Sequence, residues 1–340
     1  MENAVEFDNV SIVFGDKPNV ALPLMDAGQD RPEIQKATGQ VLGVHDCTLS
    51  VGEGEILVLM GLSGSGKSTL LRAVNGLNPV ARGCVRVNDG DQMIDVTNAR
   101  PKMLRHIRQT RVSMVFQQFG LLPWRTVREN VALGLELAEV PKAERLERAD
   151  AQLSLVGLDG WADRKVGDLS GGMQQRVGLA RAFATEAPIL LMDEPFSALD
   201  PLIRTRLQDE LLELQSALKR TIIFVSHDLD EAFKLGGRIA IMEGGRIVQA
   251  GTPREIFSNP ASNYVADFVA NMNPLGVLTA RDVMLEPRQD AHEAASVSPE
   301  TPVRSLIECL NGEDAVLQVT EGGTQIGTVT AASIIERLKD

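Results

Sequence analysis

Apolar and polar positions along the first 270 residues predict two kinds of strand. Val5–Phe14 alternates apolar with polar side chains, as a half-buried strand does, and the alternation resumes over Val44–Val51. Residues 16–40, between these two strands, are polar and punctuated by proline and glycine. They predict an inserted loop with a short helix near Glu33–Ala37.

The second kind of strand is a short, mainly apolar run without alternation. Such runs are typical of parallel strands that are buried on both faces. Each run stands beside a stretch of helical pattern, and this alternation predicts a doubly wound α/β sheet. The pair Gly244-Gly245 predicts a hairpin-like turn after the last run. The four runs are Glu55–Met60, Ile189–Met192, Thr221–Val225 and Arg238–Met242.

Helical patterns occupy Ser68–Asn75 and most of Pro101–Asp163. From about residue 272 the pattern of apolar and polar residues changes, because residues 281–296 are polar and rich in acidic side chains. A compact succession of helix, strand, strand and helix follows, which predicts a small α/β module after a linker. Its elements are expected at Val303–Leu310, Ala315–Val319, Ile326–Val329 and Ala331–Leu338.

Composition narrows the class of protein. The 340 residues are enough for one large domain and a small one. Lys and Arg number 34 against 46 Asp and Glu, a net charge of −12, which argues against a nucleic-acid partner. The exception is a basic cluster from Arg100 to Arg111, which is either a solvated helix face or a contact for a partner or a lipid.

The cysteines and the N-terminal residues indicate the compartment. Cys47, Cys84 and Cys309 are odd in number and far apart, so neither a disulfide framework nor a structural zinc site is expected. The first residues are acidic and lack the apolar core of a signal peptide. No apolar run reaches the ~18 residues that cross a bilayer. We therefore expect a cytosolic protein whose membrane role is supplied by a partner.

A glycine-rich loop carries the strongest chemical signal. Residues 61–68 fit the pattern G-x-x-x-x-G-K-[ST] between a predicted strand and a predicted helix. In such a loop, backbone N–H groups surround the phosphates of a nucleotide, Lys67 reaches the β- and γ-phosphates, and Ser68 is a ligand for Mg²⁺. The candidate nucleotide-binding residues are Gly61, Leu62, Ser63, Gly64, Ser65, Gly66, Lys67, Ser68 and the adjoining Thr69.

Two carboxylates follow the apolar strand Ile189–Met192. A carboxylate at the C-terminal end of such a strand can hold Mg²⁺, the role we expect for Asp193. The next residue, Glu194, can orient or deprotonate the attacking water. Taken alone, such a pair of carboxylates is as often simply solvated as it is catalytic. Its combination with the phosphate loop favours the catalytic interpretation.

A third motif, Leu169–Gln175, places Ser170, Gly171 and Gly172 before a helix expected over Arg176–Thr185. Its simplest role is a helix cap. A serine followed by two glycines at a helix start also forms an anion-binding end. The motif is therefore a second candidate for contact with phosphate.

This chain resembles the ABC (ATP-binding cassette) ATPases. The resemblance rests on the phosphate loop, the LSGGMQQ stretch and the ILLMDE strand together. The resemblance covers about residues 5–270. It implies a P-loop NTPase fold with a RecA-like core, an antiparallel β subdomain and a helical subdomain over about residues 118–170. It also implies ATP and Mg²⁺ as cofactors.

Further site residues follow from the resemblance alone. Gln117 matches the glutamine that contacts Mg²⁺ and the attacking water, with Gln118 as an alternative. His227 matches the histidine that contacts the γ-phosphate. Phe14 is similar to the aromatic residue that stacks on adenine, and a core phenylalanine is the alternative. The resemblance implies that Glu194 and His227 are catalytic. It implies that Ser68, Gln117 and Asp193 are metal ligands. Gln175 and Asp200 are implied as further residues of the nucleotide site.

The same family works as a pair of cassettes. There the Ser170–Gly172 loop of one copy closes over the γ-phosphate held by the other, so a homodimer is implied, with Ser197–Asp200 crossing the interface. ABC ATPases of DNA repair or translation are the rival class, but they carry long coiled coils or two cassettes. The roughly fifty residues from Gln117 to Ser170 resemble a helical subdomain that docks on an integral membrane permease, with Trp124 at the docking position.

A narrower resemblance points to importers of quaternary amines such as choline, glycine betaine and proline betaine. It rests on Glu33–Gly39, Val58–Ser63, Phe196–Arg204 and Ser226–Ala232. An importer of another small solute, such as an amino acid, is the alternative. The resemblance implies a peripheral location on the cytoplasmic side of the inner membrane, permease subunits as partners, and indirectly a substrate-binding protein.

Residues 275–340 resemble a CBS module, a regulatory domain. The likeness rests on Leu278–Met284, Ser298–Val303 and Gly327–Val329. In osmoregulatory relatives, paired modules sense ionic strength at an anionic membrane. Residues 281–340 contain five basic and eleven acidic residues, and an anionic membrane repels such a tail. A role in dimerisation or in the response to a ligand is therefore expected.

Overall fold

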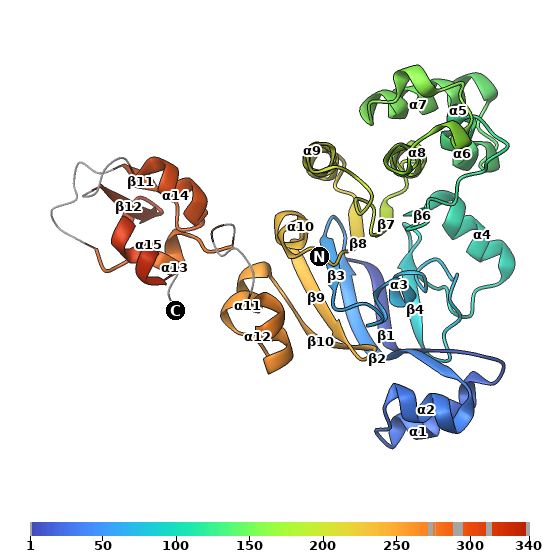
Figure 1. Cartoon of the computed structure of the whole chain (residues 1–340), viewed down its shortest axis with the longest axis horizontal. Coiled ribbons are helices and arrows are strands. Elements are labelled where there is room, and N and C mark those ends of the chain that lie inside the picture. The colour runs from blue at the N-terminus through green and yellow to red at the C-terminus, as the bar shows by residue number, and fades with distance from the viewer. Residues whose placement is uncertain (1, 271–274, 276, 288–294, 311–314, 338–340) are drawn as a thin grey trace. The chain divides into compact units, whose positions relative to one another are not determined.

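The computed structural model describes residues 2–270, 275, 277–287, 295–310 and 315–337, which Figure 1 shows in colour. The chain forms two compact units. The larger unit contains Met1–Asp228 and Leu235–Ala250, and the smaller contains Leu229–Lys234 and Gly251–Asp340. Among the described residues, none of the helices has the length and apolar character that a bilayer crossing requires.

The N-terminal part of the larger unit is a four-stranded antiparallel sheet in the order β2-β1-β4-β5. The alternating segments form its first two strands, β1 (Asn3–Phe14) and β2 (Val41–Gly52). The sequence patterns did not predict the other two, β4 (Arg82–Asn88) and β5 (Met93–Asp95). These two strands are short, and pairing rather than a strong local pattern defines them, since β4 pairs with β1 and β5 pairs with β4.

The segment between β1 and β2 contains the predicted short helix near Glu33–Ala37, and the rest of it is more ordered than the predicted loop. It forms the 3₁₀ helix η1 (Pro18–Ala21) and the helices α1 (Leu22–Asp26) and α2 (Arg31–Thr38). The reason is a small hydrophobic core of its own. Met25 and Ile34 are buried there against Val13 of β1 and Leu42 of β2.

A six-stranded sheet in the order β10-β9-β3-β8-β7-β6 forms the second layer. The strands from β9 to β6 are parallel, as predicted, and β3, β7 and β8 are buried along their whole length. The edge strand β6 falls in the stretch that we predicted to be helical, and that prediction was wrong at this point. The strands are β3 (Ile56–Met60), β6 (Val112–Val115), β7 (Ile189–Asp193), β8 (Thr221–Val225), β9 (Arg238–Glu243) and β10 (Arg246–Gly251).

Two helices contribute to the core between the sheets. This core combines side chains of both sheets with those of α3 (Lys67–Leu71) and α4 (Pro101–Thr110). Helix α3 ends earlier than the predicted Ser68–Asn75, and the chain continues as turns. The remaining helices of the larger unit are α5 (Val127–Val131), α6 (Leu133–Leu137), α7 (Lys142–Leu155), α8 (Gly171–Ala184), α9 (Pro201–Leu218), and the 3₁₀ helices η2 (Asp159–Trp161) and η3 (Val166–Asp168).

Helices α5, α6 and α7 pack against one another and against α8, away from the antiparallel sheet (Figure 1). Helix α10 (Leu229–Leu235) follows β8, and its last residue belongs again to the larger unit. Capping boxes start several of the helices. At α5, Thr126 accepts from the N–H of Glu129 while the Glu129 carboxylate accepts from the N–H of Thr126.

The smaller unit contains a three-stranded sheet in the order β11-β12-β13. Its core is formed by buried residues that include Leu278, Val303, Leu306, Leu317 and Val329. The predicted succession of helix, strand, strand and helix is present, although Leu338 lies outside the described residues. The elements are α11 (Pro253–Ser258), α12 (Asn263–Val269), α13 (Ala280–Val283), β11 (Ser296–Val297), α14 (Val303–Cys309), β12 (Val316–Glu321), β13 (Thr324–Thr330) and α15 (Ala331–Arg337).

Candidate nucleotide site

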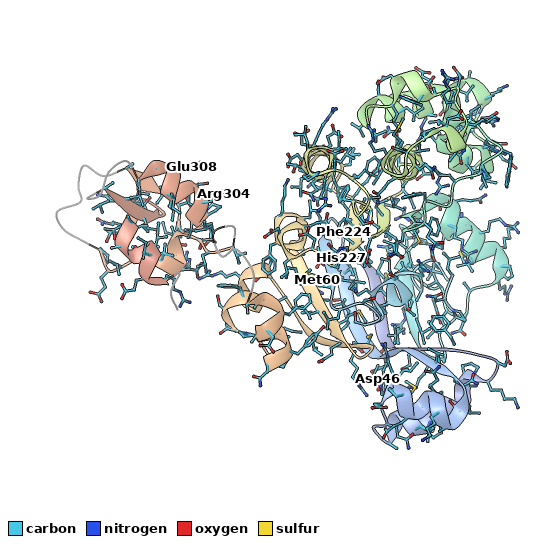
Figure 2. The ribbon with its side chains drawn as sticks, in the orientation of Figure 1. Asp46, Met60, Phe224, His227, Arg304 and Glu308 are labelled. Atoms are coloured by element: carbon cyan, nitrogen blue, oxygen red, sulfur yellow. The ribbon has the colours of Figure 1, made fainter. Side chains whose placement is uncertain are left out.

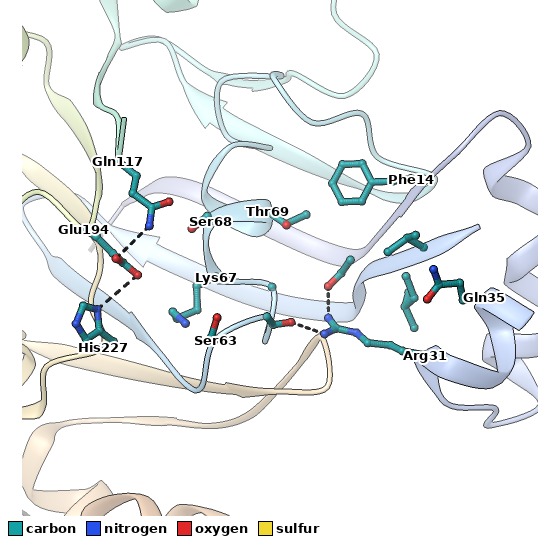
Figure 3. A pocket seen from close by; sticks show the side chains of 15 residues that line it. Phe14, Arg31, Gln35, Ser63, Lys67, Ser68, Thr69, Gln117, Glu194 and His227 are labelled. Atoms are coloured by element: carbon teal, nitrogen blue, oxygen red, sulfur yellow. Dashed lines mark hydrogen bonds and ion pairs between the residues drawn. The ribbon is translucent and has the colours of Figure 1, made fainter. Parts of the chain in front are cut away.

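A cavity of about 650 Å³ opens over the phosphate loop and is lined by fifteen residues (Figure 3). It lies where the parallel strands end. Met60 is the last residue of β3 and His227 follows the neighbouring strand β8, and both lie close together in Figure 2. Ten of the predicted site residues line the cavity: Phe14, Ser63, Gly64, Gly66, Lys67, Ser68, Thr69, Gln117, Glu194 and His227.

Two glycines of the loop are required by the backbone. Gly61 has φ 137°, and a Cβ at this position would lie 2.1 Å from the carbonyl oxygen of Met242. Gly66 has φ 102°, and its Cβ would lie 2.7 Å from the carbonyl oxygen of Gly43. Both distances are impossible for a side chain, so the close approach of the loop to β2 and β9 needs glycine here.

Lys67 is held inside the loop. Its Nζ donates to the carbonyl oxygens of Gly61, at 2.8 Å, and of Leu62, at 3.0 Å. Burial lowers the pKa of Lys67, and the negative charges of Glu194 and Asp193 act in the opposite direction. The ammonium group is therefore a positioned positive charge at the floor of the cavity, beside two carboxylates.

Ser68 and Asp193 bring the loop and β7 together. The Ser68 hydroxyl donates to Oδ1 of Asp193 at 2.6 Å. Asp193 is completely buried, and its second oxygen accepts from Nη2 of Arg72 at 2.8 Å. A fully buried carboxylate requires such partners, because removing it from water without them is costly. The sequence analysis did not identify Arg72.

Glu194 stands between two polar side chains in the cavity. Gln117 donates from Nε2 to Oε2 of Glu194 at 3.2 Å, and Nδ1 of His227 lies 3.5 Å from Oε1 (Figure 3). The backbone of Glu194 has φ 49°, in the left-handed region, and its N–H donates to the carbonyl of Val225 at 3.1 Å. A non-glycine residue held in this region is typical of a functional site.

Comparison with known proteins defines the family. Residues 44–197 match the family model described as ABC transporter. The chain is 44% identical over 332 residues to the glycine betaine/proline betaine transport system ATP-binding protein ProV of Escherichia coli (strain K12), covering 97% of this chain and 81% of that protein. The chain belongs to the ATP-binding subunits of ABC transporters.

Further relatives of this ABC ATPase support the same family assignment. It is 49% identical over 280 residues to the glycine betaine transport ATP-binding protein OpuAA of Bacillus subtilis (strain 168), which is 82% of this chain and 66% of that protein. Its fold is similar to MJ0796, a bacterial ABC transporter cassette, in a dimeric structure and in a dimeric post-hydrolysis state bound to ADP and Pi. Each comparison gives 30% identity and a TM-score of 0.63, over 74% of this chain and 99% of MJ0796. The predicted cassette fold and ATPase class are confirmed.

The LSGGMQQ motif of the ABC ATPase lies outside the cavity. Helix α8 begins at Gly171, earlier than the predicted Arg176, because Ser170 caps it by accepting from the N–H of Met173. Ser170, Gly171 and Gly172 are thus at a helix start, but none of them lines the cavity over Lys67. Within one chain, the two motifs predicted to contact phosphate are separate.

Gln175 and Asp200 also stand outside the cavity. Gln175 is buried, donating from Nε2 to the carbonyl of Glu194 at 3.2 Å and accepting from the N–H of Ala198 at 3.0 Å. It supports the backbone behind Glu194. Asp200 caps α9 by accepting from the N–H of Ile203 at 3.1 Å.

Three loop residues, Gly61, Leu62 and Ser65, do not line the cavity, and the Ser65 side chain is buried. Conversely, Arg31 and Gln35 of α2 do line it, and the sequence analysis missed both. No local pattern distinguishes them, because Arg31 lies in a stretch predicted as a polar loop, and the short helix predicted near Glu33–Ala37 gave no reason to place Gln35 at the site. The fold of that segment brings them to the site.

Proposed function

We propose that this ABC ATPase hydrolyses Mg²⁺-ATP in the cavity over Lys67 and thereby drives uptake of a quaternary amine such as glycine betaine, proline betaine or choline. The single observation that carries the catalytic part is that Lys67, Ser68 and Glu194 line one cavity, with Asp193 buried behind it and hydrogen-bonded to Ser68. The substrate class is supported by the relatives, whose names are those of betaine transport systems.

The residues beside the loop fit a magnesium ion. Asp193 offers a buried carboxylate oxygen that already faces the Ser68 hydroxyl, and Mg²⁺ prefers oxygen ligands of this kind. Ser68 and Asp193, with Gln117 from the end of β6, would hold it. When bound, Mg²⁺ neutralises the charge on the β- and γ-phosphates. Lys67 contributes a further positive charge at the same place.

Glu194 is the proposed general base. Its carboxylate is fixed from two sides by Gln117 and His227, so it can accept a proton from a water that attacks the γ-phosphate. His227 would contact that phosphate, and Phe14, 38% exposed at the other end of the cavity, would stack on adenine. Phosphoryl transfer depends mainly on positioning and charge stabilisation, which these residues supply.

Two copies of the chain would complete the catalytic site. Ser170 and Gly171 are exposed at the start of α8, Gly172 is half-buried, and all three lie outside the cavity of their own chain. In the proposed homodimer this loop closes over the γ-phosphate bound by the other copy, with the helix N-terminus directed at the anion. Asp200 would lie at the interface between the copies.

The helical subdomain, about residues 118–170, would dock on an integral membrane permease. Trp124 is 68% exposed and Leu137 60% exposed in this region, and large apolar side chains in solvent are typical of a protein contact. The ATPase would then lie peripherally on the cytoplasmic side of the inner membrane. A substrate-binding protein, acting on the permease, would select the amine.

We propose residues 5–270 as the ABC domain and 275–340 as a CBS-like regulatory domain. The described part of the latter has its own sheet and hydrophobic core, which supports an independently folding module. Its acidic charge favours dimerisation or ligand response over sensing of an anionic membrane. Deleting 275–340 and measuring transport against ionic strength tests this, because a lost salt response would contradict it.

Reconstitution tests the transport function. The chain, its permease and its binding protein are placed in proteoliposomes, and uptake of radiolabelled glycine betaine, proline betaine and choline is measured with ATP inside. We expect ATP-dependent uptake of at least one of them, and none with Glu194→Gln. Uptake of an amino acid without any quaternary amine would contradict the proposed substrate class.

A further inference from the structure

Arg31, the first residue of α2, reaches from the segment between β1 and β2 into the nucleotide cavity. Its guanidinium donates from Nη1 to the carbonyl of Gly64 in the phosphate loop and from Nη2 to the carbonyl of Gly43 in β2 (Figure 3). One side chain therefore joins the two backbones that border the cavity. A planar guanidinium can do this because its donors point in fixed, separate directions.

Helix α2 itself does not explain this arginine. A positive charge in the first turn of a helix opposes the helix dipole, which favours acidic residues there. The α2 N-terminus is already satisfied by the capping box of Asp30 and Glu33. The arginine is thus electrostatically unfavourable for its own helix.

The positive charge of Arg31 is not neutralised by a carboxylate within ion-pair distance in the described part of the chain. Within the described part of the chain, no ion pair joins Arg31 to an acidic side chain, and its Nε is buried without a hydrogen-bond partner. Burial lowers the pKa of Arg31. A half-buried cation of this kind is stabilised when an anion binds beside it.

Gly245 leaves the space that the guanidinium occupies, and Gly66 lies in contact with it. A Cβ on Gly245, in the β9–β10 turn, would lie 2.7 Å from Nη2 of Arg31. A Cβ on Gly66, in the phosphate loop, would lie 3.6 Å from the same atom. The guanidinium thus stands where the loop, β2 and the β9–β10 turn converge.

The helix that carries Arg31 is firmly anchored. Ile34 is fully buried against Val13, Met25 and Leu42. Gln35, four residues after Arg31 and so on the same face of α2, lines the cavity as well. The position of Arg31 is therefore set by packing and not by the side chain alone.

We propose that α2 is a further wall of the nucleotide site, in which Arg31 is a positioning residue that ties the phosphate loop to β2 and adds positive charge for a nucleoside triphosphate. This inference rests on the proposed nucleotide-binding function of the Lys67 cavity. It assigns a role in ATP affinity to the segment between β1 and β2.

Calorimetric titration of the full-length chain with Mg²⁺-ATP tests the proposal, together with its melting temperature without nucleotide. Hydrogen bonds to charged groups are typically worth about ten- to hundredfold in an equilibrium constant, so we expect Arg31→Met to weaken ATP binding about tenfold. Its melting temperature should stay close to that of the wild type, and Arg31→Lys should recover part of the affinity. Lys36→Met, an exposed lysine of the same helix outside the cavity, is the matched control and should bind as the wild type does.

The outcomes separate this inference from the function on which it rests. Wild-type ATP affinity in Arg31→Met, with weak binding in Lys67→Ala, overturns the role of Arg31 and leaves the nucleotide site in place. Unchanged binding in both variants overturns the nucleotide site itself. If Arg31→Met lowers the melting temperature, Arg31→Gln is used as the neutral variant instead. If Arg31→Lys binds ATP as weakly as the neutral variant does, the charge contribution of Arg31 is overturned.

Discussion

The Ser68 hydroxyl donates a hydrogen bond of 2.6 Å to Oδ1 of Asp193, although the two residues are 125 positions apart in the chain. This contact joins the end of the phosphate loop to the end of β7. It places the Ser68 hydroxyl, which lines the cavity, beside the buried carboxylate of Asp193, and Lys67 lines the same cavity.

Replacing Asp193 with Asn should remove most Mg²⁺-dependent turnover. The amide keeps the size of the side chain but loses the negative charge that faces Arg72 and the proposed ion. A metal ion contributes several kcal/mol to catalysis, so we expect ATPase activity to fall about a hundredfold or more. Phosphate release measured against Mg²⁺ concentration checks this, with Asp163→Asn, an exposed carboxylate outside the cavity, as the control. An unchanged Mg²⁺ dependence would argue against Asp193 as a ligand.

Replacing Glu194 with Gln should abolish turnover and preserve ATP binding. The amide can still be positioned between Gln117 and His227 but cannot accept the proton of the attacking water. ATP should therefore hold two copies together in a stable dimer, detectable by size-exclusion chromatography with ATP and Mg²⁺. Normal phosphate release from this variant would exclude Glu194 as the base.

Replacing Lys67 with Ala should weaken ATP binding itself. The substitution removes the positive charge that the loop carbonyls of Gly61 and Leu62 hold in place. A charged hydrogen bond is worth about ten- to hundredfold in affinity, and titration calorimetry measures the loss. Wild-type ATP affinity would contradict the role of the loop.

Replacing Ser170 with Asp should separate helix capping from the proposed dimer contact. Aspartate is a good N-cap residue, so it should keep α8 and the melting temperature nearly unchanged. Its negative charge would face the γ-phosphate of the other copy and repel it. We expect ATP binding without ATP-dependent dimerisation or turnover, whereas the neutral cap Ser170→Asn should retain more of both. Full turnover in Ser170→Asp would contradict the shared site.

Alkylation should distinguish the cysteines. Cys47 is fully buried, and burial raises the pKa of its thiol to about 12, so the reactive thiolate forms only at strongly alkaline pH. Cys309 is exposed. With iodoacetamide at pH 8, mass spectrometry should find Cys309 modified and Cys47 protected until a denaturant unfolds the chain. Modification of Cys47 in the native protein would contradict its burial.

Several elements could be predicted because their signals are local. The phosphate loop needs glycines at fixed spacing and a lysine between a strand and a helix, and residues 61–68 present this arrangement directly. The fully apolar strands around β7 and β8 were also recognisable, since burial on both faces demands apolar side chains at every position. Strand β6 was not, because four residues at a sheet edge are too few to separate from a helical pattern.

The sequence by itself determined the family and the residues whose chemistry depends on chain neighbours, among them Lys67, Asp193 and Glu194. Only the tertiary structure decided which distant residues join them. Arg31 reaches Gly64 because α2 packs on β1 and β2, and Arg72 reaches Asp193 because α3 lies beside β7. Hydrogen bonds form between groups that are close in space, and the separation of two residues along the chain does not predict that closeness.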